Sequence, residues 1–337
     1  MIKEAISQVI EGKSLGKNEA KEVFDEIMSG KCTDAQIASL ITALRMKGES
    51  VEEITGAAES MRNVVAKVNY SGKEDLLDIV GTGGDKKSTF NISTASFFVA
   101  AGAGCIVAKH GNKSVSSKSG AADVLTELGI NVETLPERNS QILSKIGLTF
   151  MFAPKHHPAM KYAIGPRKEI GVRTIFNILG PITNPANANT YLLGAYSKEL
   201  AEKLANVLLG LNVKKAIVVH GSGYDEATLV GKTAAFIAEN NFVTKIEFAP
   251  GKFGFSACSD KDLMVDSPKE SAEIIKKILE GKEKGPKRDI VLLNAGIAIY
   301  ANGKAKSISN GIEMAKNSIE SGKALAKLME LLEESNK

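Results

Sequence analysis

One stretch of the chain, residues 76–112, constrains the fold more than any other. An apolar run at residues 76–80 predicts a buried strand, and it stops at a turn that reads GTGGD, residues 81–85. An uncharged segment from Asn91 predicts a helix, and residues 105–108 predict a second strand that ends at a basic loop reading KHGN. This order of elements is typical of an α/β fold that binds an anion at the carboxyl ends of parallel strands.

The chemistry of the glycine turn supports this interpretation. Without Cβ atoms, the backbone can adopt positive φ and approach a ligand, so that successive N–H groups hold phosphate oxygens. Two common phosphate motifs fail: a dinucleotide fingerprint would need glycine at Lys86, and a Walker A loop ending at residues 231–233 would need glycine at Glu226. For the turn taken alone, a tight strand-to-helix connection without a ligand remains the alternative.

Composition excludes several classes of protein. The net charge of +4 comes from 43 basic and 39 acidic residues that are spread along the chain, which indicates a solvated surface rather than a nucleic-acid site. Cys32, Cys105 and Cys258 form no CxxC pair, so we expect reduced thiols and a cytoplasmic protein. The N-terminus lacks the apolar core of a signal peptide. Polar residues interrupt the uncharged run 88–108, which favours a buried helix, turn and strand over a membrane span.

Two regions of the chain predict helices without strands. Residues 1–68 contain two capping boxes, Thr33-x-x-Gln36 and Ser50-x-x-Glu53, each followed by apolar residues at helical spacing. Residues 160–179 also predict helix, which we expect to pack back on the N-terminal helices. Alternating strands and helices resume after residue 187, with strands at 234–239 and 245–249 that could be antiparallel, and a long helix from about residue 311 ends the chain.

The motifs GTGGD, NIST (residues 91–94) and KHGN (residues 109–112), in this order, resemble the anthranilate phosphoribosyltransferase family. Further segments agree: SVSSKSG at residues 114–120, RKE at 167–169, GVRT at 171–174, FNILGP at 176–181, and the acidic pair at 225–226. The resemblance covers at least residues 78–226. Each piece is weak alone, and the combination is specific.

The resemblance implies an α/β fold class: a small all-helical domain plus a larger α/β domain with a mostly parallel central sheet, similar to nucleoside phosphorylases and phosphoribosyltransferases. We expect the helical domain to comprise residues 1–69, with 159–187 packing back on it. The α/β phosphoribosyl-binding domain then comprises residues 70–158 and 188–337. A homodimer through the helical domain is implied by the resemblance alone.

The activity implied by the resemblance is transfer of phosphoribose from phosphoribosyl pyrophosphate (PRPP) to the amine of anthranilate, with release of pyrophosphate, in tryptophan biosynthesis. The family's PRPP-binding positions fall here on Gly81, Gly84, Asp85, Thr89, Asn91, Ile92, Ser93, Thr94, Lys109, His110, Gly111, Asn112, Lys113, Ser114, Val115, Ser116, Ser117 and Ala121. The family usually has arginine at Lys113 and commonly serine at Ala121, so we expect backbone contacts at these two positions.

The resemblance also implies a metal site and an anthranilate site. Asp225 and Glu226, with Ser93, are oxygen ligands suited to Mg²⁺. Without the other motifs, an ordinary exposed acidic pair would be the preferred interpretation of the two carboxylates. Arg167 would bind the anthranilate carboxylate through its planar guanidinium, unless it forms a surface ion pair with Glu169.

Further expectations concern the amine end of anthranilate and the histidines. Gly81 and Asn112 would meet the amine, while His110 and residues 180–181 would lie on the path that anthranilate takes. No general base stands out, and we expect none, with Lys109 and Arg167 acting by positioning. His156 and His157 lack metal-ligand spacing and are interpreted as structural.

Two other functions stay open at this level. A pyrimidine nucleoside phosphorylase shares the expected architecture but would use phosphate as its nucleophile. A non-catalytic relative that binds nucleic acid should lose the acidic pair or Arg167 and concentrate its basic residues, whereas this chain keeps both and spreads its lysines.

Overall fold

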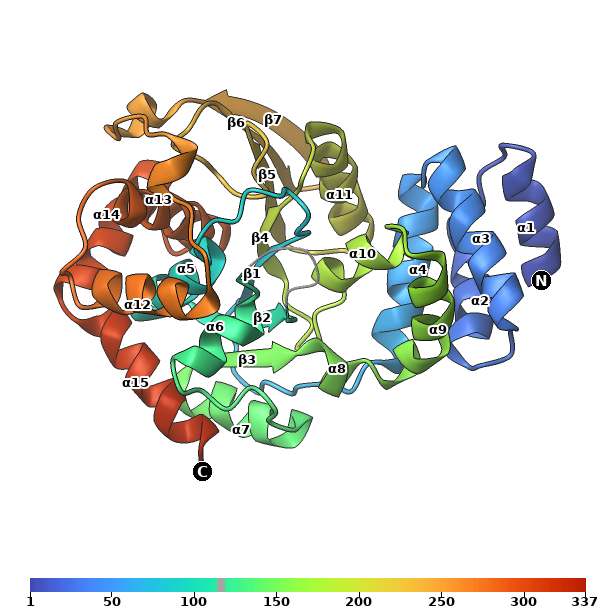
Figure 1. The fold of residues 1–337 in the computed structure, drawn as a ribbon, viewed down its shortest axis with the longest axis horizontal. Coiled ribbons are helices and arrows are strands. Elements are labelled where there is room, and N and C mark those ends of the chain that lie inside the picture. The colour runs from blue at the N-terminus through green and yellow to red at the C-terminus, as the bar shows by residue number, and fades with distance from the viewer. Residues whose placement is uncertain (114–118) are drawn as a thin grey trace.

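The computed structural model describes residues 1–113 and 119–337. The chain begins with four helices, α1 (Ile2–Ile10), α2 (Lys17–Met28), α3 (Asp34–Lys47) and α4 (Val51–Val64), which lie together at one end of the molecule (Figure 1). Both expected capping boxes are present: Thr33 and Gln36 exchange side-chain and backbone hydrogen bonds at the start of α3, as do Ser50 and Glu53 at the start of α4.

The larger part of the chain is built on one seven-stranded sheet. Its strands are β1 (Leu76–Gly81), β2 (Ile106–Gly111), β3 (Leu148–Phe152), β4 (Thr190–Gly194), β5 (Lys215–Gly221), β6 (Thr233–Glu239) and β7 (Phe242–Phe248). They lie in the order β3-β2-β1-β4-β5-β6-β7. The first five are parallel, β6 pairs antiparallel with β5, and β7 pairs antiparallel with β6. The order reverses between β1 and β4, which is where α/β sheets bind ligands.

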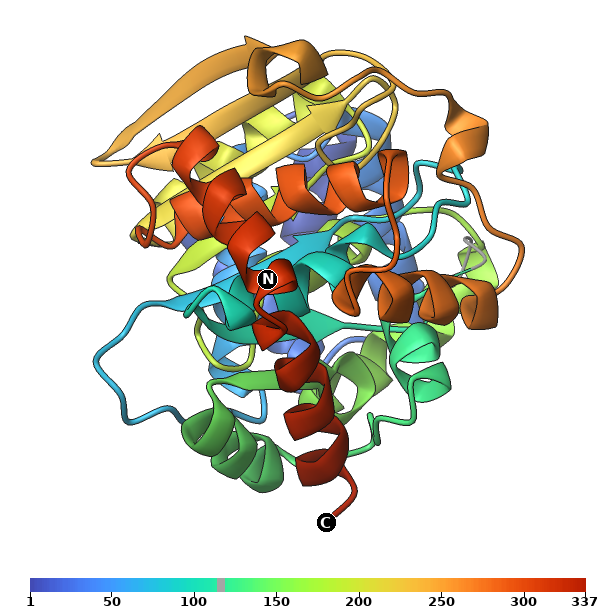
Figure 2. The same cartoon turned by 90° about the vertical axis from the view of Figure 1, so that its left-hand side faces the viewer.

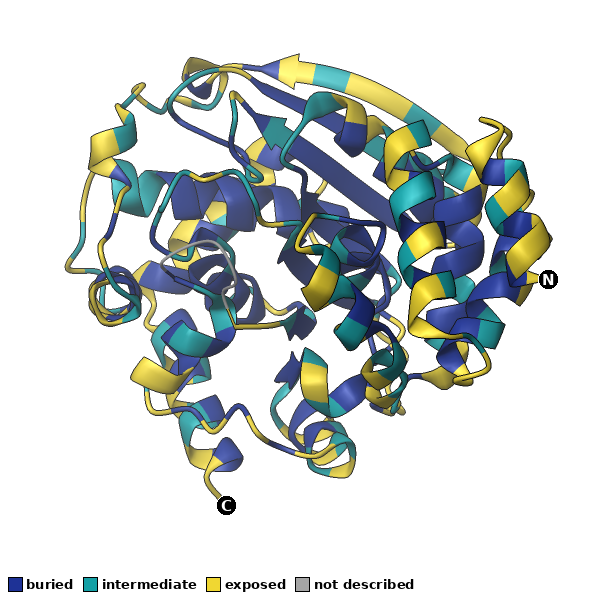
Figure 3. Cartoon of the chain, turned by 45° about the vertical axis from the view of Figure 1, so that its right-hand side comes forward, coloured by how far each residue is buried: buried dark blue, intermediate teal, exposed yellow. Residues whose placement is uncertain are grey.

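Successive side chains of the inner strands point alternately into two separate hydrophobic cores. Leu77 and Ile79 of β1 belong to a cluster that includes residues of α5, α12, α13, α14 and α15, and Figure 2 shows the C-terminal helices in front of the strands. Leu76 and Val80 belong to a second cluster, on the other face, that runs without a break into α11 and the N-terminal helices. Burial on both faces explains why these strands are apolar throughout, whereas the edge strand β7 is largely exposed (Figure 3).

The helices outside the N-terminal four are α5 (Ile92–Gly102), α6 (Ala121–Glu127), α7 (Pro136–Ile146), α8 (Ala153–His156), α9 (Lys161–Ile170), α10 (Phe176–Leu179), α11 (Lys198–Gly210), α12 (Pro268–Leu279), α13 (Pro286–Ala301), α14 (Ile308–Glu320) and α15 (Lys323–Ser335). Short 3₁₀ turns lie at Pro158–Met160, Gly180–Ile182, Pro250–Phe253 and Asp260–Asp262.

Two helix predictions were wrong in the same way. Residues 160–179 are not one helix, because Gly171 adopts a left-handed conformation with φ of 62° that ends α9, and an irregular segment precedes α10. The terminal helix is likewise divided into α14 and α15 at Gly322, with φ of 76°. A single glycine is tolerated within a helix or ends it, and sequence alone does not distinguish the two outcomes.

The structure confirms the fold class, a small helical domain plus an α/β domain with a mostly parallel sheet. Helix α9 packs against α2 and α3, beside the N-terminal helices in Figure 1. Across the described residues, no helix combines the length and apolar character needed to cross a membrane.

Candidate active site

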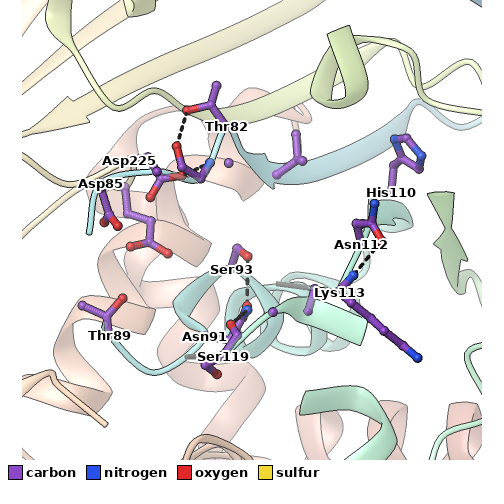
Figure 4. Close-up of a pocket in the computed structure, with 18 of the residues that line it drawn as sticks. Thr82, Asp85, Thr89, Asn91, Ser93, His110, Asn112, Lys113, Ser119 and Asp225 are labelled. Carbon is purple, nitrogen blue, oxygen red and sulfur yellow. Dashed lines mark hydrogen bonds between the residues drawn. The ribbon is translucent and has the colours of Figure 1, made fainter. Parts of the chain in front are cut away.

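A cavity of about 270 Å³ lies at the carboxyl ends of the central parallel strands. Its walls come from the loop after β1, the first turn of α5, the end of β2, the loop after β5, and the segment between α9 and α10. In Figure 4, Asp85 and Asp225 lie together on one side, and Asn112 and Lys113 lie on the other. The cavity therefore stands at the point where the strand order reverses.

The glycine turn depends on backbone conformations that few residues adopt. Gly83 and Gly84 have φ of 63° and 84°, and Lys86 and Ser88 also have positive φ values of 60° and 53°. A left-handed conformation is unfavourable for residues with Cβ, so the loop holds two strained positions, Lys86 and Ser88, within four residues of its last glycine. Such strain fits a loop whose shape is required by a ligand.

Gly81 and Gly194, paired at the ends of β1 and β4, make room for Asp225. A Cβ on Gly81 would lie 2.5 Å from Asp225 Oδ2, and one on Gly194 would lie 1.4 Å from the Asp225 backbone oxygen. In return, Asp225 Oδ2 accepts a hydrogen bond from the Gly83 N–H at 2.6 Å. The acidic pair is thus locked to the glycine turn, although 142 residues separate them in sequence.

Three carboxylates form the only cluster with metal-ligand geometry among the described residues. Oxygen atoms of Asp85, Asp225 and Glu226 lie within 4.8 Å of one another. Burial, followed by the neighbouring carboxylates, raises the pKa of Asp225 and Glu226. Glu226 Oε2 is buried without a hydrogen-bond partner. Repelling carboxylates with an orphaned buried oxygen are suited to a hard divalent cation, so the residues present fit Mg²⁺.

The start of α5 presents polar groups to the same cavity. Asn91 Oδ1 accepts hydrogen bonds from the Thr94 N–H at 2.9 Å and the Ser93 hydroxyl at 3.1 Å, which makes Asn91 the N-cap of the helix. Asn91 and Ser93 line the cavity, and Ser93 faces it near the carboxylates (Figure 4). Ile92 and Thr94 are fully buried and do not line it.

Lys109 is a buried cation beneath the cavity. Its Nζ donates to the backbone oxygen of Ile79 and, at 3.2 Å, to Ser93 Oγ. Burial lowers the pKa of Lys109 to about 8, and the neighbouring Asp78, Glu226 and Asp225 oppose that effect. A lysine with this pKa is still mostly protonated at pH 7, so it supplies positive charge to the cavity.

His110 is held from both ring nitrogens. Its Nδ1 lies 3.0 Å from the Gly180 backbone oxygen and its Nε2 lies 3.2 Å from Nε2 of His157. Because the carbonyl can only accept, Nδ1 carries the proton and His157 donates to His110. Asp78 accepts the His110 backbone N–H at 3.1 Å, which fixes the end of β2. The separate bonds of His156 to Ala66 and Asn139 agree with a structural role for that histidine.

Most of the residues expected to bind PRPP meet in this cavity, but not all. Those that line it are Gly81, Gly84, Asp85, Thr89, Asn91, Ser93, Lys109, His110, Gly111, Asn112, Lys113 and Ala121, together with Asp225 and Glu226. Ser114, Val115, Ser116 and Ser117 lie outside the described residues. The sequence had suggested no role for several further lining residues, among them Thr82, Gly83, Ser88, Ser119, Arg173 and Asn177.

Arg167 does not line the cavity. It projects from α9, half-buried, with Cζ 5.4 Å from the centre of the Phe176 ring, and burial lowers its pKa. The alternative ion pair with Glu169 is not formed in the part of the chain that the structure describes. Among the described residues, the Arg167 guanidinium therefore has no ion-pair partner, and it lies against Phe176 of α10.

Comparison with known proteins places the chain in a class and then in a family. The glycosyl transferase family models match, with the helical bundle domain at residues 3–65 and the α/β domain at residues 73–325. An anthranilate phosphoribosyltransferase of Acetivibrio thermocellus is 50% identical over 100% of this chain and 97% of that protein; one of Aquifex aeolicus is 47% identical over 100% and 99%. This chain belongs to the anthranilate phosphoribosyltransferase family.

Solved structures agree. The Thermus thermophilus anthranilate phosphoribosyltransferase superposes with a TM-score of 0.94 at 38% identity, covering 99% of both chains. The Saccharomyces cerevisiae enzyme in complex with PRPP and Mg has a TM-score of 0.89 at 28% identity, covering 99% of this chain and 98% of that one.

Proposed function

We propose that this protein transfers the phosphoribosyl group of PRPP to the amine of anthranilate, giving N-(5-phosphoribosyl)anthranilate and pyrophosphate, in tryptophan biosynthesis. One observation carries the proposal: the glycine turn, the basic KHGN loop and three carboxylates, which are distant in sequence, meet in a single cavity. The family membership and the yeast complexes with PRPP and Mg and with 4-fluoroanthranilate support it.

The PRPP site proposed here is the cavity itself. Backbone amides of the glycine turn and the first turn of α5 would bind the phosphate oxygens, and the helix terminus adds a partial positive charge. Lys109 places a buried cation below them. Lys113 and Ala121, where the family pattern differs, line the cavity and would contribute backbone groups. Ser114, Val115, Ser116 and Ser117 are included in this site by family resemblance only.

The metal site is proposed at Asp225 and Glu226, with Ser93 as a further ligand. Asp85, first assigned to PRPP alone, belongs to the same carboxylate cluster and is added to this set. When bound, Mg²⁺ would offset the negative charge that pyrophosphate carries as it leaves. The chain's own part is to hold the three carboxylates close together.

Anthranilate is proposed to bind with its carboxylate at Arg167 and its amine toward Gly81 and Asn112. The guanidinium of Arg167 has five donors in a fixed plane and, among the described residues, contacts only the Phe176 ring without a hydrogen bond or ion pair, so it is available for a carboxylate. Its place outside the cavity, on α9, fits a second substrate that approaches from the helical side.

No general base is required in this mechanism. A neutral arylamine is nucleophilic at pH 7, and departure of pyrophosphate from C1 of the ribose leaves an oxocarbenium-like centre for it to attack. The acidic arylammonium formed when the N–C1 bond is made then releases its extra proton to water. His110, the nearest imidazole, has both ring nitrogens engaged. Catalysis then rests on positioning the two substrates and on electrostatic stabilisation of the leaving group.

The test is the loss of anthranilate fluorescence on mixing with PRPP and Mg²⁺. Consumption of anthranilate with stoichiometric pyrophosphate release is expected. A pyrimidine nucleoside phosphorylase would instead cleave a nucleoside with phosphate, and a nucleic-acid-binding relative would do neither. Absence of turnover at every substrate concentration would overturn the proposal.

The domain boundaries are proposed as residues 1–69 with 159–187, and residues 70–158 with 188–337. Packing of α9 on α2 and α3 supports the inclusion of the middle segment in the helical domain.

A homodimer through the helical domain is also proposed. Ile10 and Met46, which are 70% and 84% exposed, flank an apolar groove between α1 and α3. Apolar side chains gathered in this way are typical of a covered surface. Size-exclusion chromatography with light scattering should give a dimer that Met46→Glu dissociates; a monomeric wild-type chain would contradict it.

A cytoplasmic location is proposed from the three free cysteines.

A further inference from the structure

Arg173 occupies an unusual position at the glycine turn. It lies on the segment between α9 and α10, half-buried, and lines the cavity. Its Nη2 is 3.4 Å from the backbone oxygens of both Thr82 and Gly83. Its guanidinium Cζ lies 4.7 Å from the centre of the Tyr196 ring. One side chain from the helical side of the molecule thus reaches two carbonyls of the turn after β1.

The absence of a Cβ at Gly84 leaves room for the Arg173 side chain. A Cβ on Gly84 would lie 1.7 Å from Arg173 Nη1 and 2.7 Å from its Cζ, so the guanidinium rests directly against the glycine backbone. Tyr196, whose ring also contacts the guanidinium, is fixed to the same turn, because its backbone N–H donates to Thr82 Oγ1 at 3.2 Å. The guanidinium therefore contacts both an aromatic ring and the turn that it binds.

These contacts set the direction of the peptide groups. In a trans peptide the C=O and the following N–H point in opposite directions. Arg173 faces the oxygens of Thr82 and Gly83, so the N–H groups of Gly83 and Gly84 point away from it. The first of these donates to Asp225 at 2.6 Å. A cation on one side and a carboxylate on the other hold the turn between them.

We propose that Arg173 is a positioning residue for PRPP: it holds the glycine turn so that the Gly84 amide is directed at the diphosphate, and its charge favours that anion. This inference rests on the proposed function. A lysine is a point charge and cannot span two carbonyls while stacking on a ring, so the site requires arginine. Arg167 and Arg173, six positions apart, then serve different substrates.

The first experiment compares Arg173→Lys and Arg173→Gln with the wild-type chain in steady-state kinetics. The PRPP KM should rise by about tenfold or more in Arg173→Gln and less in Arg173→Lys, because a charge-assisted contact is worth about one order of magnitude or more. The anthranilate KM should stay within about twofold. Calorimetric titration with PRPP and Mg²⁺ alone should show the same weakening.

Arg62→Lys is the matched control. Arg62 donates from Nε and Nη2 to the Ile182 oxygen at 3.0 and 2.8 Å, so it makes the same kind of contact, but it does not line the cavity. Its PRPP KM should equal that of the wild type. If Arg62→Lys raises the PRPP KM as much as Arg173→Lys does, Arg173 is only structural and the inference is overturned. The same conclusion follows if Arg173→Gln raises the KM values of PRPP and anthranilate equally.

A double-mutant cycle with Gly84→Ala tests the contact itself. The strain of alanine at φ of 84° is common to both backgrounds, whereas the clash with Nη1 exists only when Arg173 is present. Gly84→Ala should therefore raise the PRPP KM less in Arg173→Gln than in the wild type; additive effects would refute the proposed contact.

Should the Arg173 variants not fold, Tyr196→Leu removes the supporting ring while keeping the arginine and should raise only the PRPP KM, whereas Tyr196→Phe should leave it unchanged. Equal KM values for the two tyrosine variants would count against the proposal. A wild-type chain that does not bind PRPP would mean that the proposed function has failed, and this result is distinct from failure of the Arg173 role.

Discussion

The His110–His157 pair should make the free energy of unfolding fall in acid. His157 is 8% exposed, and its Nε2–H donates to Nε2 of His110 at 3.2 Å. Burial, and then the neighbouring His156, lower the pKa of His157 to about 4 from its ordinary 6.5. A proton added to Nδ1 of His157 would place a charge in a buried site, and one added to Nε2 of His110 would also remove the acceptor of the hydrogen bond.

The sign and size of the effect follow from proton linkage. Between about pH 6.5 and 4, the unfolded chain binds a proton on this side chain that the folded chain does not, so folding becomes weaker as the pH falls. The loss from His157 is about 2 kcal/mol by pH 5 and about 3 kcal/mol by pH 4, relative to neutral pH. The stability contributed by the neutral pair is complete above the unfolded pKa.

The assay is urea denaturation across this pH range with the wild type and His157→Gln. Glutamine keeps an N–H donor near the position of Nε2 and does not titrate, so the groups common to both proteins, including the buried His156, largely cancel in the difference. The wild type should lose about 2 kcal/mol more than His157→Gln between neutral pH and pH 5. Parallel pH dependences would refute the buried neutral histidine pair.

Three other substitutions test the site. Arg167→Lys should raise the anthranilate KM far more than the PRPP KM, because a point charge cannot replace the planar guanidinium; equal effects would contradict its role. Asp225→Asn combined with Glu226→Gln should abolish Mn²⁺ binding seen by electron paramagnetic resonance and most turnover; an unchanged metal titration would place the metal elsewhere. Gly194→Ala forces a Cβ to within 1.4 Å of a backbone oxygen and should lower the free energy of unfolding by at least about 1–3 kcal/mol, whereas Gly251→Ala, with no atom within 4 Å, should change it little.

The parts of the fold predicted from sequence were those with strong local signals. The capping boxes at Thr33 and Ser50 and the apolar run of β1 depend on neighbouring residues, and the structure confirms them. The helix breaks at Gly171 and Gly322 depend on tertiary packing, since nothing local distinguishes a glycine within a helix from one that ends it.

The site shows the same division between local and distant signals. Motifs with local chemistry, such as the glycine turn, indicated the cavity. Residues whose role arises from contacts across the chain did not: Arg173 reaches a turn about 90 positions earlier, and Asp85 joins two carboxylates from the loop after β5. The GVRT motif was noticed at Arg173, but a motif gives no direction for a long side chain.

The unbroken apolar cluster between the N-terminal helices and the sheet means that the helical bundle is not a detachable module. Leu193 and Val218 of the sheet share one packed interior with Leu40 and Ile54 of the bundle. A chain shortened to start at β1 would turn that interior face toward water and aggregate. For the same reason, any movement that narrows the cavity during turnover has to proceed by sliding of packed helices. Separation of the helical bundle from the sheet would expose their shared apolar interior to water.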